Sequence, residues 1–256
     1  MDLGLTGRVA LVAGGSSGLG LAVARTLAAE GAHVAICARD PDRLARAHAE
    51  IDACGPGRVT SASVDLTDDD AVAAWVRDTA AELGALHIVV TNSGGVPHGP
   101  VDAFDTGVYR EALAGNTVPH VALALAALPF LTRAGWGRIV MITSEAVRQP
   151  LADTALSAVA RLGVLGFAKG LVQSLGAQGV TVNVLAPGFH RTPALDAQFG
   201  EDVEQAVAEV AKGLPLGRVG RAEDFGALAA FLASEQASFV TGTVLLADGG
   251  NTRGLG

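Results

Sequence analysis

Residues 13–31 read AGGSSGLGLAVARTLAAEG, and this stretch decides the fold. It follows a short apolar run at residues 9–13 and continues into an amphipathic segment at 18–30. Glycines at positions 14, 18 and 20 allow a tight turn, a close approach of the backbone to a pyrophosphate and close packing of helix on strand. The N–H groups and the positive dipole end of the following helix would face the phosphates. This strand, glycine-rich turn and helix therefore predict a nucleotide-binding unit.

The same alternation of apolar runs and helical segments continues along the chain of 256 residues. Short, continuous apolar runs separated by helices indicate a parallel sheet that is covered on both faces. Such βαβ units cross over in a right-handed sense and build a doubly wound fold. We therefore expect an α/β protein with a Rossmann-type doubly wound parallel sheet of about seven strands, flanked by helices. The expected strands are residues 9–13, 33–38, 59–64, 88–91, 137–142, 181–185 and 243–247, and the expected helices are residues 18–30, 41–53, 68–83, 108–134, 151–176 and 221–233.

No linker rich in Pro, Gly or Ser divides the chain, so we expect a single domain over residues 1–256. One insertion interrupts the alternation at about residues 189–220, and it contains a short helical segment of its own. A loop of this size often carries function, for example as a lid over a site. Its small apolar residues would suit a hydrophobic ligand, although a lid helix alone would have the same composition.

The composition narrows the classes of function. The net charge is −8 and there is no basic cluster, which argues against a nucleic-acid partner. The longest apolar runs contain Pro or His and stop short of a membrane span, so we expect no membrane partner. The first residues turn glycine-rich without a basic segment, so we expect no signal peptide and a cytoplasmic location. Cys37 and Cys54 lack the spacing of metal ligands, so we expect no metal site.

The end of the second expected strand bears on the choice of dinucleotide. A fold specific for NAD would place an acid at this strand tip, where it accepts from the ribose 2′-OH. Here the tip is Ala38, followed by Arg39, whose guanidinium suits a 2′-phosphate, so NADP(H) is favoured over NAD(H). Alternatively, Arg39 is a solvated residue that pairs with a neighbouring aspartate. Asp65 closes the third strand, where its carboxylate can accept from an adenine amino group or cap the segment that follows.

Six motifs together resemble the short-chain dehydrogenase/reductase family. They are GGSSGLG, VDLTD, TNSGG, GRIVMITS, TVNVLAPGFHRTP and FVTGTVLLADGG, and they run in the family's order over essentially the whole chain. The resemblance implies a dimer or tetramer, paired through the helices expected at residues 108–134 and 151–176. It also implies a set of cofactor-binding residues: Gly14, Ser16, Ser17, Gly18, Leu19, Gly20, Arg39, Asp65, Leu66, Asn92, Ser93, Gly94, Pro187, Gly188 and Thr192.

Active members of that family use four catalytic residues, Asn, Ser, Tyr and Lys. Asn116 matches the first and would hold a water, and Ser144 matches the second and would hydrogen-bond a substrate carbonyl. The Tyr normally follows the Ser by about thirteen residues, with the Lys four further along the same helix face. Those positions hold Ser157 and Arg161 in this sequence, and the only tyrosine of the chain is Tyr109, in another segment.

Half of the usual catalytic set is therefore replaced. A serine hydroxyl is a far weaker acid than a phenol, and an arginine keeps the positive charge but exchanges no proton. Histidine, with a pKa near 6.5, is a credible proton donor. His98 or His190 is thus a candidate to compensate on the substrate side, as are Glu145 and Arg148, although each can equally be a solvated loop residue.

The motif LSAVARLGVLGF beside TNSGGVPHGP resembles a divergent subgroup of the family, similar to β-ketoacyl carrier-protein reductases but with Ser and Arg at the Tyr and Lys positions. This implies an enzyme that transfers hydride between NADP(H) and a small-molecule carbonyl or alcohol, with 3-oxoacyl thioesters among the candidates. Two alternatives are open. One is a non-redox enzyme that uses the same pocket for elimination or isomerisation. The other is an inactive cofactor-binding or regulatory protein.

Overall fold

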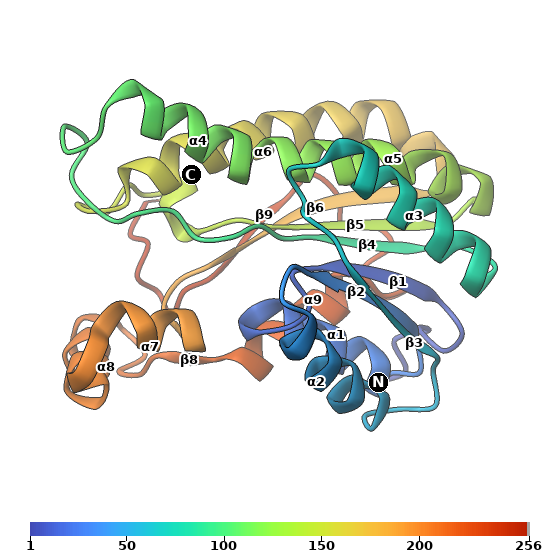
Figure 1. The fold of residues 1–256 in the computed structure, drawn as a ribbon, viewed down its shortest axis with the longest axis horizontal. Coiled ribbons are helices and arrows are strands. Elements are labelled where there is room, and N and C mark those ends of the chain that lie inside the picture. Colours follow the sequence, from blue (N-terminus) through green and yellow to red (C-terminus); the bar gives the residue numbers. More distant parts are fainter. Residues whose placement is uncertain (255–256) are drawn as a thin grey trace.

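The computed structural model describes residues 1–254, and it contains one central sheet of seven strands (Figure 1). The strand order is β3-β2-β1-β4-β5-β6-β9, and every neighbouring pair is parallel. The bounds are β1 Val9–Ala13, β2 His33–Ala38, β3 Val59–Ser63, β4 Ile88–Thr91, β5 Gly137–Ile142, β6 Val180–Pro187 and β9 Val244–Ala247. The order reverses between β1 and β4, which opens a crevice at the carboxyl ends of these strands. The expectation of a Rossmann-type doubly wound sheet is confirmed.

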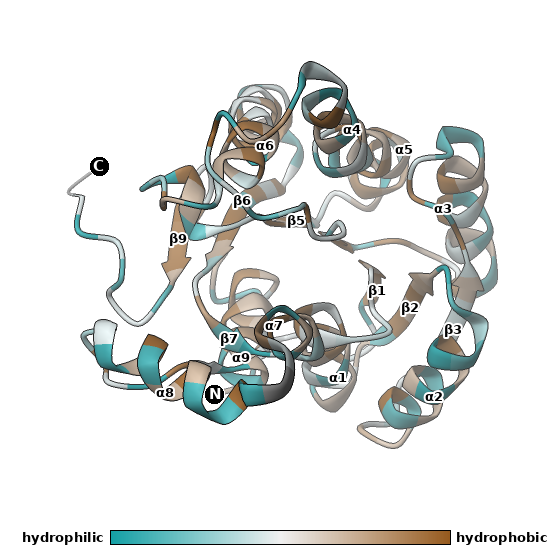
Figure 2. Cartoon of the chain, turned by 60° about the vertical axis from the view of Figure 1, so that its left-hand side comes forward, coloured by the Kyte–Doolittle hydropathy of each residue, from teal (hydrophilic) through white to brown (hydrophobic). Residues whose placement is uncertain are grey.

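Helices cover both faces of the sheet (Figure 1). On one face lie α1 Gly18–Ala29, α2 Pro41–Asp52 and α9 Ala222–Leu232, and on the other lie α3 Asp69–Leu83, α4 Thr106–Asn116, α5 Val118–Ala134 and α6 Ala155–Leu175. Short 3-10 turns occur at η1 Glu145–Val147, η2 Gly176–Gln178 and η3 Gly200–Asp202. Figure 2 shows the strands as mostly apolar and the outer surfaces of α2 and α3 as largely polar, as this layered arrangement requires.

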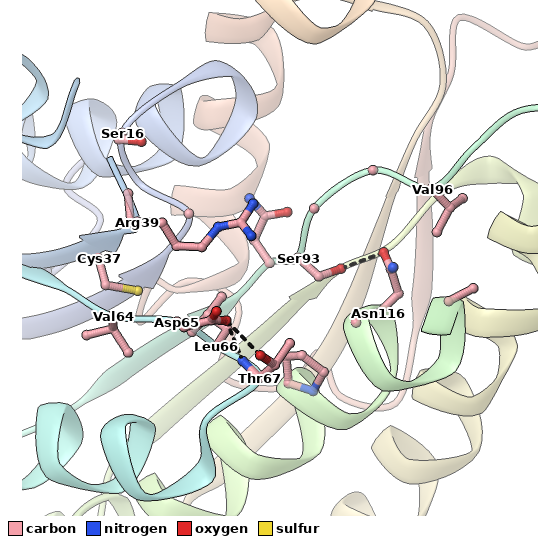
Figure 3. A pocket seen from close by; sticks show the side chains of 18 of the residues that line it. Ser16, Cys37, Arg39, Val64, Asp65, Leu66, Thr67, Ser93, Val96 and Asn116 are labelled. Carbon is pink, nitrogen blue, oxygen red and sulfur yellow. Dashed lines mark hydrogen bonds between the residues drawn. The ribbon is translucent and has the colours of Figure 1, made fainter. Parts of the chain in front are cut away.

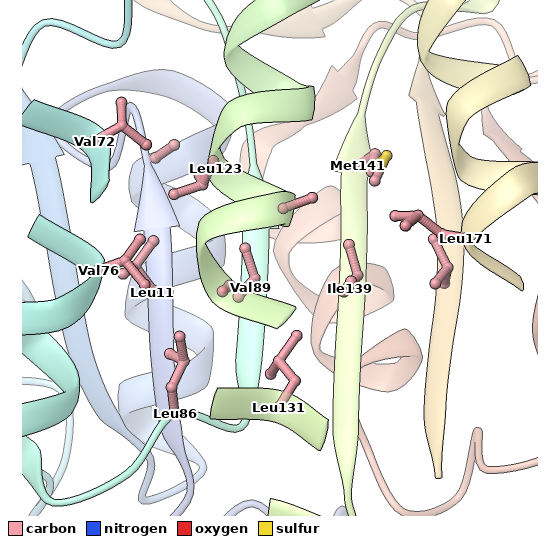
Figure 4. Packing of buried hydrophobic residues seen from close by; sticks show 14 of the residues in the cluster. Leu11, Val72, Val76, Leu86, Val89, Leu123, Leu131, Ile139, Met141 and Leu171 are labelled. Atoms are coloured by element: carbon pink, nitrogen blue, oxygen red, sulfur yellow. The ribbon is translucent and has the colours of Figure 1, made fainter. Parts of the chain in front are cut away.

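The strands are continuous apolar runs because each of their two faces meets a layer of helices. Leu11, Val89 and Ile139 are paired across three neighbouring strands and are fully buried under α3, α5 and α6 (Figure 4). The next residue of each strand points to the opposite face, where Val12 and Val90 pack under α1 and α9. A side chain that is buried on either face must be apolar, so no polar alternation develops.

The helix expected at residues 108–134 is wrong as a single element, because it is interrupted at Thr117, between α4 and α5. Pro119 has no N–H to donate to the carbonyl of Gly115, four residues earlier, and this favours a new helix with Pro119 in its first turn. The hydroxyl of Thr117 instead donates to the carbonyl oxygen of Ala160 on α6. The break therefore holds the end of α4, including Asn116, against α6.

Two further boundaries differ from those expected. The helix expected from residue 151 begins at Ala155, because Leu151–Thr154 forms a turn in which the Thr154 hydroxyl donates to the Leu151 carbonyl over 3.0 Å. The insertion at 189–220 has two helices rather than one, α7 Pro193–Phe199 and α8 Val203–Gly213, framed by a small parallel pair, β7 His190–Arg191 and β8 Gly220–Arg221.

By length and composition alone, the segments Thr106–Ala134 and Ala155–Gln178 are apolar enough to cross a membrane. In the structure both pack one face on the sheet, where Leu123, Leu131, Val164 and Leu171 join the core. The buried faces of these helices thus explain part of their apolar character. Their outward faces also carry exposed apolar side chains, among them Leu125 and Leu162.

Candidate active site

A cleft of about 640 Å³ lies at the carboxyl ends of β1, β2, β3 and β4, where the strand order reverses (Figure 3). The segments that follow these strands form its wall, and the end of α4 and the start of α5 close it on one side. Of the residues expected at the site, the lining includes Gly14, Ser16, Arg39, Asp65, Leu66, Asn92, Ser93, Gly94 and Asn116.

The glycine-rich turn between β1 and α1 is shaped to receive a phosphate. Gly14 has a φ of 62°, in the left-handed region, and a Cβ on Gly20 would collide with the Gly14 carbonyl oxygen. Ser17 precedes α1, but within the described chain its side chain caps none of the helix's first N–H groups. These N–H groups remain available to an anion, and the turn therefore fits the pyrophosphate of a dinucleotide. Gly18 lies beside Thr192, since a Cβ placed on Gly18 would be 3.6 Å from the Thr192 side chain.

One end of the cleft carries opposite charges just beyond two neighbouring strands, β2 and β3 (Figure 3). Arg39 is exposed just beyond β2, while neighbouring Asp40 caps α2 by accepting from the Arg43 N–H over 2.9 Å, which leaves Arg39 facing the cleft. Asp65 accepts from the N–H of Thr67 at 3.0 Å and from its hydroxyl at 2.8 Å. These bonds, with a contribution from Arg39, lower the pKa of Asp65. The cap of α3 is not Asp65 but Asp68, three residues on.

Ser157 and Arg161 lie one turn apart on α6, and both are buried. Arg161 Nη1 donates to Ser157 Oγ at 3.0 Å, and Nη2 donates to the Gly94 carbonyl at 3.0 Å. Burial lowers the pKa of Arg161 to about 10, so the guanidinium stays charged near neutral pH. Its Nε is buried and finds no acceptor within residues 1–254. Arg161 thus ties the α6 serine to the loop that lines the cleft, and one of its N–H groups is unused.

A chain of hydrogen bonds leads from the interior to the same cleft. His120 on α5 is completely buried, with Nδ1 at 2.5 Å from Thr91 Oγ1 and Nε2 at 3.3 Å from Ser93 Oγ. Ser93 in turn donates to Asn116 Oδ1 at 3.0 Å (Figure 3). Sequence reasoning missed His120 and Thr91. The available signal was a histidine four residues after Asn116 in an otherwise apolar stretch.

Ser144 and Glu145 follow β5 and lie outside the lining of the cleft. Ser144 Oγ accepts from the Ala146 N–H at 3.2 Å, which caps a 3-10 turn. Glu145 is buried; its Oε2 accepts from Asn251 Nδ2 at 3.0 Å and would lie 2.9 Å from a Cβ on Gly188. Burial, and to a lesser degree the charge of Asp248, raises the pKa of Glu145 to about 7. This carboxyl therefore joins three segments: the loop after β5, the Pro187–Gly188 turn and the stretch 248–251.

The histidines considered as compensating donors have contrasting surroundings. His98 is exposed, in a loop whose next residue, Gly99, donates its N–H to Asp153 beside the start of α6. His190 is buried, its Nδ1 lies 3.1 Å from the Gly188 carbonyl, and its ring meets Phe225 edge-on. Burial lowers the pKa of His190. Neither lines the cleft.

The remaining expected residues lie outside the cleft lining. Arg148 is exposed after the 3-10 turn η1, and the Tyr109 hydroxyl donates to the Val101 carbonyl at 2.8 Å. No group of three His, Cys, Asp or Glu side chains suited to a metal ion occurs in residues 1–254. Besides His98, His190 and Arg148, the expected site residues that do not line the cleft are Ser17, Gly18, Leu19, Gly20, Ser144, Glu145, Ser157, Arg161, Pro187, Gly188 and Thr192.

A family model described as enoyl-(acyl carrier protein) reductase matches residues 13–252. The chain belongs to the short-chain dehydrogenase/reductase family. It is 34% identical over 248 residues to 2-dehydro-3-deoxy-L-rhamnonate dehydrogenase (NAD(+)) of a Sphingomonas species, with 96% of each chain covered. It is 31% identical over 247 residues to a 3-oxoacyl-[acyl-carrier-protein] reductase of Chlamydia muridarum, covering 96% of this chain and 98% of that one.

Among solved structures, L-sorbose reductase from Gluconobacter frateurii complexed with NADPH and L-sorbose superimposes with a TM-score of 0.94, at 28% identity and with 100% of both chains covered. Short-chain dehydrogenase/reductase relatives of this chain thus include one named for NAD(+) and one bound to NADPH. Family membership establishes a nicotinamide-dependent oxidoreductase class.

Proposed function

We propose that this short-chain dehydrogenase/reductase interconverts a small carbonyl compound and its alcohol with NADP(H), using Ser157 and Arg161 in place of the family's Tyr and Lys. The main support is that hydrogen bonds connect the cleft to the Ser157 and Arg161 pair. The glycine-rich turn opens one end of the cleft, and Arg161 joins its Gly94 wall directly to Ser157. When bound, the nicotinamide would supply or accept the hydride.

The geometry supports a role for Ser157 as hydrogen-bond donor to the substrate oxygen. The Arg161 N–H occupies a lone pair of Ser157 Oγ, which leaves the hydroxyl hydrogen free to donate elsewhere. A positive donor on this oxygen favours its deprotonated form, which partly offsets the weak acidity of a serine. Asn116 and Ser144 complete the proposed catalytic set.

The preference for NADP(H) rests on Arg39. Its guanidinium lines the cleft beyond β2, Arg43 lines it one helical turn further on, and Asp40 is occupied as a helix cap. Two cations at this position suit a 2′-phosphate, whereas a 2′-hydroxyl would call for a carboxylate.

The insertion supports the proposal of a lid over an apolar substrate. None of the described residues of α8 is buried, and Figure 2 shows polar and apolar residues mixed along this helix. Arg191 holds the start of the insertion through ion pairs to Asp196 at 2.6 Å and Glu204 at 2.7 Å. We propose a 3-oxoacyl thioester as the first substrate class, which the named activity of the Chlamydia relative supports.

We also propose that two copies pair through the outward faces of α4, α5 and α6. Leu113, Val118, Leu125, Val159 and Leu162 are 38–50% exposed on these helices. Only 33% of the most apolar window of Thr106–Ala134 is buried in the monomer, so a large apolar surface is left over. A second copy of the same face would cover it, giving a dimer or a tetramer built from dimers.

The experiment has two steps. Fluorescence titration with NADPH and NADH measures cofactor binding, and oxidation of NADPH is then followed with acetoacetyl thioesters, ketones and ketoses. Binding with turnover on at least one carbonyl supports the proposal. Binding without turnover, together with activity created by S157Y/R161K, would instead favour a non-redox enzyme or a regulatory protein.

A further inference from the structure

The hydrogen positions along Thr91, His120, Ser93 and Asn116 can be derived one group at a time. The carbonyl oxygen of the Asn116 amide only accepts, so Ser93 uses its single hydroxyl hydrogen on it. Toward His120, Ser93 Oγ can then only accept, so His120 Nε2 must carry the hydrogen. Burial, with a contribution from the charge of Arg161, lowers the pKa of His120 to about 3, so the imidazole is neutral. Its Nδ1 is therefore bare and accepts from the Thr91 hydroxyl.

The opposite direction of the chain is chemically possible but leaves a buried group unsatisfied. If His120 Nδ1 carried the hydrogen, it would donate to Thr91, and Nε2 would accept from Ser93. The Asn116 amide would then have to turn over and donate to Ser93. Thr91 is buried at the end of β4, and its hydroxyl hydrogen would find no other acceptor within residues 1–254. An unsatisfied buried donor is unfavourable, so the chain runs outward, from Thr91 to Asn116.

This direction decides what the cleft presents to a ligand. Asn116 Oδ1 accepts from Ser93, so Nδ2, on the other side of the same amide, points away from Ser93. Asn116 lines the cleft. Its Nδ2 makes no hydrogen bond within the described chain, and it is not one of the atoms that are both fully buried and without a partner. Two N–H groups therefore face the cleft, whose lining also includes Gly94, the residue whose carbonyl accepts from Arg161. An oxygen that gains negative charge is the ligand group that suits them.

We propose that His120 is a positioning residue which, through Ser93, holds the Asn116 amide with its N–H groups toward the oxygen of the substrate carbonyl. This rests on the proposed carbonyl/alcohol chemistry, because a donor at this point strengthens its bond as that oxygen becomes an alkoxide. His120 itself touches neither substrate nor cofactor. Its single hydrogen at Nε2 decides whether Asn116 offers a donor or an acceptor.

The tautomer can be tested without any activity. The chain has six histidines, so ¹⁵N spectra of the imidazoles of the whole protein, compared with those of H120Q, identify the His120 signals. We expect the Nε2–H tautomer, unchanged when the pH is varied across the neutral range. S93A removes the acceptor of Nε2–H and should shift His120 toward the Nδ1–H tautomer, which can donate to Thr91 Oγ1. A native Nδ1–H tautomer, or a His120 that titrates near neutral pH, would overturn the proposal.

Kinetic measurements distinguish a positioning role of His120 from a purely structural one. With NADPH and an acetoacetyl thioester, H120L and S93A should each lower kcat about tenfold, the effect of loosening one preorganised donor. H120Q, which returns an N–H near the Nε2 position, should recover most of kcat. The control is H87L, which removes a half-buried imidazole that holds the Val9 N–H at the far end of the sheet. It should lower Tm but not kcat. Equal kcat values in H120L and wild type would refute the positioning role of His120. If the wild type did not turn over at all, the proposed function would be refuted, and the tautomer measurement alone would decide the direction of the hydrogen-bond chain.

Discussion

Arg161 Nη1 lies 3.0 Å from Ser157 Oγ, one turn earlier on α6, and the two side chains are buried together. The same guanidinium reaches across to the Gly94 carbonyl at the wall of the cleft. A buried cation normally requires an anion, but here two neutral oxygens are its only hydrogen-bond partners within residues 1–254. In the proposed function, this charge stabilises the deprotonated form of Ser157 when the substrate oxygen takes up its proton.

Replacing Ser157 tests whether this pair carries the reaction. S157A should lower kcat for carbonyl reduction about 100-fold, the usual effect of losing a positioned proton donor. The Kd for NADPH should stay within about twofold, because Ser157 does not line the cleft. Steady-state kinetics and NADPH fluorescence measure the two quantities.

The matched control is S174A, which removes an exposed serine hydroxyl from the same helix. It should leave both quantities unchanged. If S157A reduced carbonyls as fast as wild type, the proton would have to come from another group, and the assignment of Ser157 would be wrong.

Coenzyme choice should depend on Arg39. R39D removes the cation beyond β2 and introduces the carboxylate that suits a ribose 2′-hydroxyl. We expect the Kd for NADPH to rise by about 10- to 100-fold, the loss of one or two charge-assisted hydrogen bonds, and the Kd for NADH to fall. Fluorescence titration with both coenzymes measures this, with R46A on the exposed side of α2 as the control. An unchanged ratio of the two Kd values would show that Arg39 is only a solvated surface residue.

The sheet could be predicted from the sequence because its strands face helices on both sides. A run such as Val9–Ala13 is apolar at every position, and such a short continuous run, followed by a glycine-rich turn, is typical of a strand that is buried on two faces. The break at Thr117 could not be predicted in the same way. A proline such as Pro119 occurs both in the first turn of a new helix and at kinks within one, and the contact of Thr117 with Ala160 joins residues 43 positions apart.

The residues of the site that belong to sequence motifs with a regular spacing could be predicted. The glycine turn, Asn116 and the pair Ser157 and Arg161 are readable from spacing and family resemblance. His120 is different, because its partners Thr91 and Ser93 lie on another segment, 29 and 27 residues away. Its function as a hydrogen-bonding group exists only once β4 and α5 are packed together.

Glu145 should make stability depend on pH. Its pKa is 4.5 in an unfolded chain and about 7 in the folded protein, where burial raises it. Between these values the folded state holds a proton that the unfolded state has released, so stability falls as pH rises from about 4.5 to 7 and stays low above 7. The full difference is about 3 kcal/mol. Burial acts to raise the pKa of Asp248, but hydrogen bonds donated by Thr252 and Gly250 lower it overall, so Asp248 titrates below this window.

The variant E145Q keeps an acceptor for Asn251 and cannot ionise. We expect it to be more stable than wild type at pH 8 and to flatten the pH dependence between pH 5 and 7, as measured by urea unfolding at a series of pH values. E82Q, at a largely exposed carboxylate, is the control and should follow wild type. His190 titrates in both proteins, so only the difference between them reports on Glu145. Parallel curves for E145Q and wild type would contradict the raised pKa.

Leu162 tests the proposed pairing of copies. It is 48% exposed on α6, and its side chain would become buried if this face met a second copy. L162D would bring a charge into that contact, and an unpaired buried charge costs several kcal/mol. We therefore expect light scattering coupled to size exclusion to show half the native mass or less, while NADPH still binds because Leu162 does not line the cleft. A45D places the same charge on the exposed face of α2 and should keep the native mass. A monomeric wild type, or an L162D variant with the native mass, would show that the apolar face of α4, α5 and α6 is not where the copies meet.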